Sequence, residues 1–290
     1  IRPGNGAILP YLPPYSPEQN PIAALKKLRE FHNDKSIDDI IRDYLFGFTK
    51  QVLMKTKRAL GAVSTPPEVI RFMLSLFSPS QNEALNVLEP ACGDAPFLQA
   101  FQEKFGQTHA LFGVEYDVER SRPPELPNLH FQQADFLLSD FSQTFDLILG
   151  NPPYGIIGDQ SHYPIYTFKE VKAAYRKRSE TWHGKYNIYG AFIEQAAKVL
   201  SESGELIFVV PSTWMLLQDF KLLRKFLANS GTLDVHYLGR VFPGVQVTAV
   251  VIRLKKSAPG TLRLYDGQTL WLEKNDYHGE MIRFETETTR

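Results

Sequence analysis

The sequence is poor in cysteine, with Cys92 as its single thiol. One thiol excludes an internal disulfide framework and a zinc site built from several cysteines. Long apolar runs are also missing, and without about 18 consecutive apolar residues no transmembrane helix is predicted. No basic segment followed by an apolar core opens the chain, so we expect no secretory signal. These absences together predict a cytoplasmic protein that has no membrane partner.

An excess of charge of one sign is absent as well. The chain has 32 basic and 32 acidic residues, which gives a formal net charge of zero. Composition therefore does not indicate a nucleic-acid binder, and any charge that meets DNA must be local or come from another region. The apolar content of 43% over 290 residues is that of a globular protein with a sizeable core.

The N-terminal part differs from the rest of the chain. It opens with Ile1, and the segment 12–22 (Leu-Pro-Pro-Tyr-Ser-Pro-Glu-Gln-Asn-Pro-Ile) resembles the tail of DDE insertion-sequence transposases. That family has a metal-binding glutamate where this chain has Ala23, so no transposase chemistry is expected. A helix is predicted over 36–60. We interpret residues 1–53 as a leader, consisting of a transposase-like remnant and this helix.

Strands and helices alternate from residue 65 onward. Thr65-Pro-Pro-Glu is typical of a capped helix start. Continuous apolar strands separated by helices predict a doubly wound, mostly parallel α/β sheet covered on both faces. The last two strands form an expected antiparallel hairpin at a sheet edge, and short irregular pieces are expected after Ser257. The strands are expected at 85–89, 111–115, 129–133, 145–150, 205–211, 233–238 and 247–254, and the intervening helices at 97–105, 191–200 and 218–228.

Three successive strand ends carry residues suited to a nucleotide-like ligand, and ligands of open α/β sheets bind at such ends. The first strand leads into the small-residue turn Ala-Cys-Gly-Asp-Ala at 91–95, and the helix after it is expected to point its N–H groups at a carboxylate. Glu115 ends the second strand at the spacing of an acid that binds a ribose diol. Asp135 and Phe136 follow the third, where an acid and an aromatic ring suit an adenine.

The strongest motif, Asn151-Pro152-Pro153-Tyr154, follows the fourth strand. The lone pair of an adenine N6 amine is delocalised into the ring, so the amine is a poor nucleophile. The Asn151 side-chain oxygen and the Pro152 carbonyl can accept its two protons and localise the lone pair. The prolines fix the direction of that carbonyl, and Tyr154 supplies an aromatic face. A base inside a duplex must be flipped out to reach such a pocket.

Residues 58–290 resemble the gamma-class, TaqI-type DNA adenine-N6 methyltransferases of restriction systems. The resemblance is carried by the segments 65–69, 88–92, 146–155, 184–192, 208–211, 247–253 and 282–286. It implies S-adenosyl-L-methionine as the cofactor and double-stranded DNA as the substrate. It implies a cofactor site lined by Thr65, Glu89, Ala91, Glu115, Asp135, Phe136 and Pro153. It also implies that Asn151, Pro152 and Tyr154 hold the target adenine and that Phe242 packs on its other face; no metal is expected.

The resemblance also implies a domain division. Residues 54–257 are expected to form the catalytic domain, and 258–290 the start of a connection to a target-recognition domain that this chain lacks. A separately encoded recognition domain and a cognate restriction endonuclease are possible partners, and we expect a monomer. Basic residues at 169–178 suit either phosphate contacts or a solvated helix face.

Two other functions fit the same residues. A protein glutamine methyltransferase also needs a motif that holds a planar amide. A fragment that binds S-adenosyl-L-methionine without methylating would keep the strand-end residues and lack activity.

Overall fold

The computed structural model describes residues 64–79, 83–117, 123, 125–157, 164–165, 170–242 and 248–284. The chain divides into two units, Ile1–Lys55 and Thr56–Arg290, and every described residue belongs to the second. The expected leader, with its transposase-like segment and its helix at 36–60, lies outside the described residues. No helix in the described part has the length and apolar character needed to cross a membrane.

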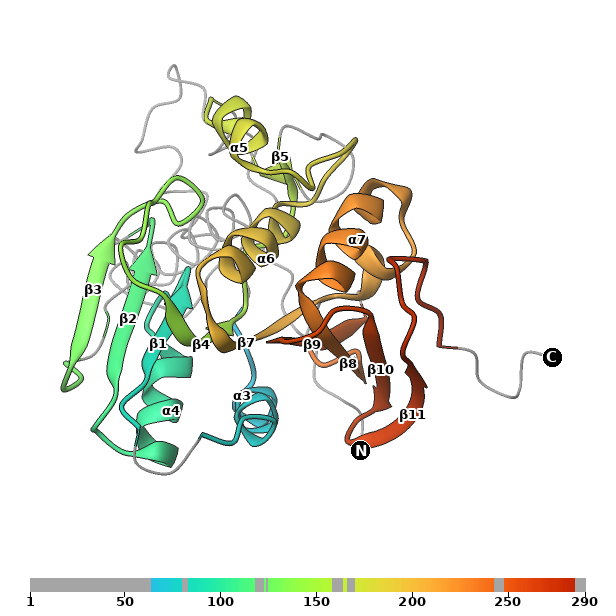
Figure 1. Cartoon of the computed structure of the whole chain (residues 1–290). Coiled ribbons are helices and arrows are strands. Elements are labelled where there is room, and N and C mark those ends of the chain that lie inside the picture. The colour runs from blue at the N-terminus through green and yellow to red at the C-terminus, as the bar shows by residue number, and fades with distance from the viewer. Residues whose placement is uncertain are drawn as a thin grey trace, which may run out of the picture. The chain divides into compact units, whose positions relative to one another are not determined.

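Strands and helices alternate in the described unit as expected, and Figure 1 shows their arrangement. The longer helices are α3 (Pro67–Ser75), α4 (Pro96–Phe105), α5 (Lys172–Arg178), α6 (Ile188–Lys198) and α7 (Lys221–Ser230), with 3-10 turns η1 (Ser212–Met215) and η2 (Gln218–Phe220). The strands are β1 (Asn86–Pro90), β2 (Ala110–Glu115), β3 (Leu129–Gln133), β4 (Phe145–Gly150), β5 (Ile156–Ile157), β6 (Pro164–Ile165), β7 (Leu200–Pro211), β8 (Gly231–Gly239), β9 (Ala249–Lys256), β10 (Thr261–Asp266) and β11 (Thr269–Lys274).

Nine of these strands form one mixed sheet in the order β11-β10-β8-β9-β7-β4-β1-β2-β3. The pairs β3–β2, β2–β1, β1–β4, β4–β7 and β8–β10 are parallel, whereas β9 runs antiparallel to both β7 and β8. The predicted doubly wound, mostly parallel sheet is therefore confirmed.

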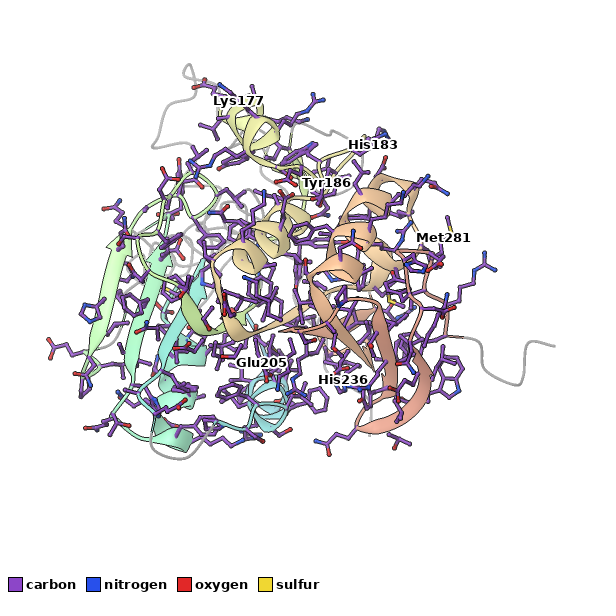
Figure 2. The ribbon with its side chains drawn as sticks, viewed as in Figure 1. Lys177, His183, Tyr186, Glu205, His236 and Met281 are labelled. Carbon is purple, nitrogen blue, oxygen red and sulfur yellow. The ribbon has the colours of Figure 1, made fainter. Side chains whose placement is uncertain are left out.

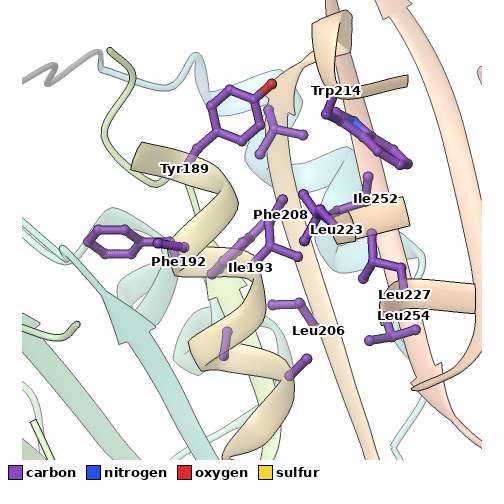
Figure 3. Close-up of a cluster of buried hydrophobic side chains, with 14 of the residues drawn as sticks. Tyr189, Phe192, Ile193, Leu206, Phe208, Trp214, Leu223, Leu227, Ile252 and Leu254 are labelled. Carbon is purple, nitrogen blue, oxygen red and sulfur yellow. The ribbon is translucent and has the colours of Figure 1, made fainter. Parts of the chain in front are cut away.

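Helices cover both faces of the sheet because the buried side chains of each strand alternate between two apolar clusters. In β7, Leu206 and Phe208 join one cluster and Ile207 and Val209 the other. The first cluster also contains the apolar faces of α6 and α7 (Figure 3), and the second those of α3 and α4. The two apolar clusters, one on each face of the sheet, thus hold the strand ends in place.

The C-terminal edge of the sheet differs from the expectation. The strands expected at 233–238 and 247–254 do pair antiparallel, as β8 and β9, but they lie inside the sheet. The edge hairpin is β10–β11, so the irregular pieces expected after Ser257 are wrong for residues 261–274. β11 was missed because all but the last of its residues are exposed, which gives no buried-face pattern.

Candidate active site

The site lies where the strand order of the sheet reverses. From β1 the chain continues through β2 and β3 on one side, and β4 then pairs with β1 on the other. Because β1 and β4 are parallel, their C-terminal ends lie at one edge, and ligands of open α/β sheets bind at this switch point. The two ends are close: a Cβ placed on Gly150 would lie 3.7 Å from Cγ of Glu89.

The turn after β1 is built from small residues in an unusual conformation. Ala91, Gly93 and Ala95 have φ angles of 58°, 54° and 53°, which are left-handed values rarely adopted by alanine. The Cys92 N–H donates to the Val114 carbonyl of β2 (2.9 Å), which ties the turn to the neighbouring strand. Such strain is concentrated at functional sites, where a tight backbone approaches a ligand.

The carboxyl group of Glu89, near the end of β1, lies at the N-terminal end of helix α4. Its side chain accepts a hydrogen bond from the Leu98 N–H (3.1 Å), and Glu89 is only 2% exposed. The carboxylate expected at this helix start is therefore supplied by the protein itself. Burial raises the pKa of Glu89 well above its ordinary range, against the lowering effect of the helix N–H groups.

Glu115 and Asp135 end or follow the next two strands, as expected. Glu115 accepts from the N–H groups of Gly93 and Asp117, both at 2.8 Å, so it also holds the turn after β1. Asp135 accepts from the Leu137 N–H (3.0 Å) and from the Tyr175 hydroxyl (2.5 Å). Both carboxylates are thus held in fixed orientations by protein donors before any ligand binds.

Phe136 is placed differently from Asp135. It is 2% exposed and packs against Phe192 of α6, with ring centroids 5.3 Å apart. Little of its ring is open for stacking on a ligand, so Glu115 and Asp135 are the better candidates for direct contacts.

These residues fit S-adenosyl-L-methionine. Carboxylates at three neighbouring strand ends suit its positive charges, its ribose diol and its adenine amine. The turn at 91–95 offers small side chains beside them.

The Asn151 amide group, directly after β4, is held at both ends. Its Nδ2 donates to Oγ1 of Thr65 (2.9 Å), and its Oδ1 accepts from the Tyr154 hydroxyl. Thr65 was expected to cap helix α3, but the N-cap is Pro66 and no side chain caps this helix. The Thr65 hydroxyl is bonded to Asn151 instead, which brings together residues expected in the cofactor site and in the adenine site.

Aromatic side chains surround Tyr154. Its ring lies edge-on to Phe242, at 6.4 Å between centroids, and to Tyr189 of α6, at 6.2 Å. Phe242 is 5% exposed, so it is packed in the loop after β8. Pro152 is buried and Pro153 is partly buried.

Asn187 is a site residue for which no role was predicted. Its Oδ1 accepts from the Gly155 N–H (2.8 Å), and Ile188 donates to the Gly155 carbonyl (2.9 Å). The chain is thereby fixed directly after the Asn151–Tyr154 motif. The only signal was the position of Asn187 within the segment 184–192.

Helix α5 lies beside the loop that follows β3. Arg178 donates to the Leu138 carbonyl (2.9 Å) and pairs with Asp140, and Lys172 donates to the Ile157 carbonyl (2.6 Å). Arg176 and Lys177 are exposed, and among the described residues neither has an ion-pair partner. Figure 2 shows Lys177 at the outer side of this helix.

Comparison with solved structures identifies the fold. The chain matches a type I restriction-modification methyltransferase subunit from Streptococcus thermophilus with a TM-score of 0.54 and 19% identity, over 70% of this chain and 47% of the other. It matches a protein from Listeria monocytogenes assigned to the class I S-adenosylmethionine-dependent methyltransferases with a TM-score of 0.51 and 19% identity, over 69% and 64%. The predicted cofactor is that of this class.

Comparison of sequences identifies closer relatives. The chain is 51% identical over 241 residues to the type II methyltransferase M.TthHB8I of Thermus thermophilus, and 28% identical over 207 residues to M.HincII of Haemophilus influenzae. The matches cover 80% and 69% of this chain but only 55% and 38% of the relatives, so the chain spans about half of their length or less. Residues 74–240, more than half of the chain, match the model of one family, and the chain belongs to the Eco57I restriction-modification methylases.

Proposed function

We propose that this protein transfers a methyl group from S-adenosyl-L-methionine to the N6 amine of adenine in DNA, as a TaqI-type, gamma-class enzyme of a restriction-modification system. The observation that carries the proposal is the fixed Asn151 amide at the end of β4, beside the end of β1. The type II methyltransferases among the relatives support DNA as the substrate.

The target amine would be held by the motif itself. Asn151 Oδ1 and the Pro152 carbonyl accept its two protons, which directs the nitrogen lone pair toward the methyl donor. In this proposal Tyr154 and Phe242, which lie edge-on to each other in the structure, separate to pack on the two faces of the adenine ring. The base must leave the duplex to enter. One N6–H bond is replaced by the new N–C bond, and the released proton passes to water.

Bound S-adenosyl-L-methionine supplies an electrophilic methyl group and leaves as the neutral thioether. In this proposal Glu115 accepts the ribose hydroxyls and Asp135 the adenine amine. Positive charge on the methionine part would oppose the burial that raises the pKa of Glu89, so its carboxylate forms and balances that charge when the cofactor binds. Thr65, Ala91 and Pro153 line the same cofactor site, and Phe136 packs behind it.

The organisation of the chain is part of the proposal. Residues 54–257 form the catalytic domain together with the β10–β11 hairpin, which extends their sheet. Residues 1–53 are a dispensable leader, and the rest of 258–290 begins the connection to a target-recognition domain. The partners are double-stranded DNA, that recognition domain and a cognate endonuclease, and the enzyme works as a monomer in the cytoplasm.

The test combines the chain with tritiated S-adenosyl-L-methionine and an excess of mixed-sequence duplex DNA, followed by nucleoside analysis. We expect N6-methyldeoxyadenosine. Asn151→Ala should lower the transfer rate at least about 100-fold, because one preorganised group is lost, and should leave cofactor affinity within about two-fold. Label on protein glutamine instead of DNA would favour the glutamine methyltransferase, and cofactor binding without transfer would favour the non-catalytic fragment.

A further inference from the structure

The side-chain amide of Asn151 has two orientations that differ by exchange of its oxygen and nitrogen, and only one offers an acceptor to an incoming amine. In the structure Nδ2 is bonded to Thr65 Oγ1 at 2.9 Å, and Oδ1 is on the side of Tyr154. The bond to Thr65 joins the start of α3 to the end of β4 across 86 residues of sequence.

Thr65 has no helix-capping role that would explain this bond. The N-cap of α3 is Pro66, followed by Pro67 at the first helical position, and no side chain caps the helix. The two prolines restrict the backbone beside Thr65, so its hydroxyl is presented at a defined position. The partly buried Thr65 hydroxyl therefore acts on Asn151 and not on its own helix.

The oxygen of the Asn151 amide faces the Tyr154 hydroxyl, a donor that has two acceptors within reach. The Tyr154 hydroxyl lies within hydrogen-bond reach of Asn151 Oδ1 and of the Val209 carbonyl on β7, the latter at 3.0 Å. Burial raises the pKa of Tyr154 well above its ordinary range, so the hydroxyl keeps its proton. One proton can serve only one of these acceptors well, and donation to Val209 releases Oδ1 from the Tyr154 hydroxyl.

We propose that Thr65 is a positioning residue that acts through Asn151. Its Oγ1 holds Nδ2 so that Oδ1 faces the target amine, while the Tyr154 hydroxyl turns to the Val209 carbonyl when the amine arrives. This inference rests on the proposed function, because it assigns Asn151 Oδ1 to the substrate. It changes the expected role of Thr65 from lining the cofactor site to orienting the group that binds the target.

The test compares Thr65→Val, which has the same shape without an acceptor, with Thr65→Ser, which keeps the hydroxyl. Single-turnover methyl transfer to duplex DNA and cofactor affinity by calorimetry are measured for both variants, for the unmodified chain and for Asn151→Ala. The side-chain amide NMR signals of Asn151 are measured for the unmodified chain and the two Thr65 variants, and Asn151→Ala identifies these signals by their loss. Thr65→Val should slow transfer roughly 10–100-fold, as expected when one amide donor loses its partner. Thr65→Ser should stay within about three-fold.

Two readouts separate positioning from a cofactor contact. Under the proposal Thr65→Val leaves cofactor affinity within about two-fold, shifts the Asn151 amide protons and speeds exchange of the proton that Thr65 Oγ1 accepts in the structure. A cofactor contact alone would lower affinity and leave the Asn151 signals of the free protein in place, which would overturn the inference.

The remaining outcomes separate this inference from the proposed function. Unchanged transfer in Thr65→Val beside an inactive Asn151→Ala would overturn the positioning role and leave the function standing. If the unmodified chain methylates no adenine, or if Asn151→Ala transfers as fast as the unmodified chain, the proposed function fails. The Asn151 signals would then still report whether the Thr65 bond orients the amide.

Discussion

Tyr175 on α5 donates a hydrogen bond to Asp135 in the loop after β3, with 2.5 Å between the two oxygens. Burial raises the pKa of Asp135, and the bond from Tyr175 opposes that rise more than any other group does. A helix distant in sequence thereby favours the ionised form of a carboxyl group that we assign to the cofactor site.

Tyr175→Phe should therefore raise the pKa of Asp135 further, because the strongest opposing contact is removed. The free energy of unfolding should fall by about 1–3 kcal/mol at a pH where Asp135 is ionised. Carboxyl carbon NMR titration measures the pKa. Tyr189→Phe, which removes a different buried hydroxyl, is the matched control. Equal Asp135 titration in the two variants would contradict this assignment.

Glu89→Gln should stabilise the cofactor-free protein at neutral pH. The folded pKa of Glu89 is raised, so its carboxyl favours folding most below the ordinary glutamate pKa of about 4.3. This contribution is lost as the pH rises through the folded pKa. Glutamine keeps an acceptor for Leu98 without ionising. The free energies of unfolding of the two proteins, measured with urea between pH 4 and 8, should differ by an amount that grows with pH. Parallel curves would contradict the prediction.

Glu115 is proposed to bind the cofactor and also holds the turn after β1, and its replacement tests both roles. Glu115→Ala should weaken cofactor binding by roughly 2–4 kcal/mol, because charge-assisted hydrogen bonds are lost. It should also loosen the turn after β1, since Gly93 and Asp117 lose their acceptor. Glu115→Gln keeps an acceptor and should cost less. Calorimetric titration measures the affinity for the cofactor, and an unchanged affinity in Glu115→Ala would remove this residue from the site.

Helix α5 offers a test of the DNA surface. If the exposed Arg176 and Lys177 contact phosphates, Arg176→Ala with Lys177→Ala should weaken binding equally for all sequences. The slope of log K against log salt should become shallower by about 1.8, at about 0.9 for each phosphate contact. Arg71→Ala, on the exposed side of α3, is the control. An unchanged slope would leave α5 as a solvated helix face.

Much of the architecture was readable from local sequence. Strands β3 and β4 begin and end where the apolar runs predicted, and the residues at their ends follow from chain order alone. Because the C-terminal ends of parallel strands share one edge, Glu115, Asp135 and Asn151 could be assigned to one site before any contact was known. The order of the motifs along the chain was sufficient for this assignment, because the residues of each turn are neighbours in the sequence.

Only the tertiary structure decided which groups meet. The bonds Thr65–Asn151, Tyr175–Asp135 and Asn187–Gly155 join residues 86, 40 and 32 positions apart. Such pairs depend on strand register and helix packing, which are set by the whole sheet and leave no local periodicity. The same cause placed β8 and β9 inside the sheet and β11 at its edge. The sequence by itself determined which residues stand at the strand ends; the packed sheet determined which of them hold one another in position.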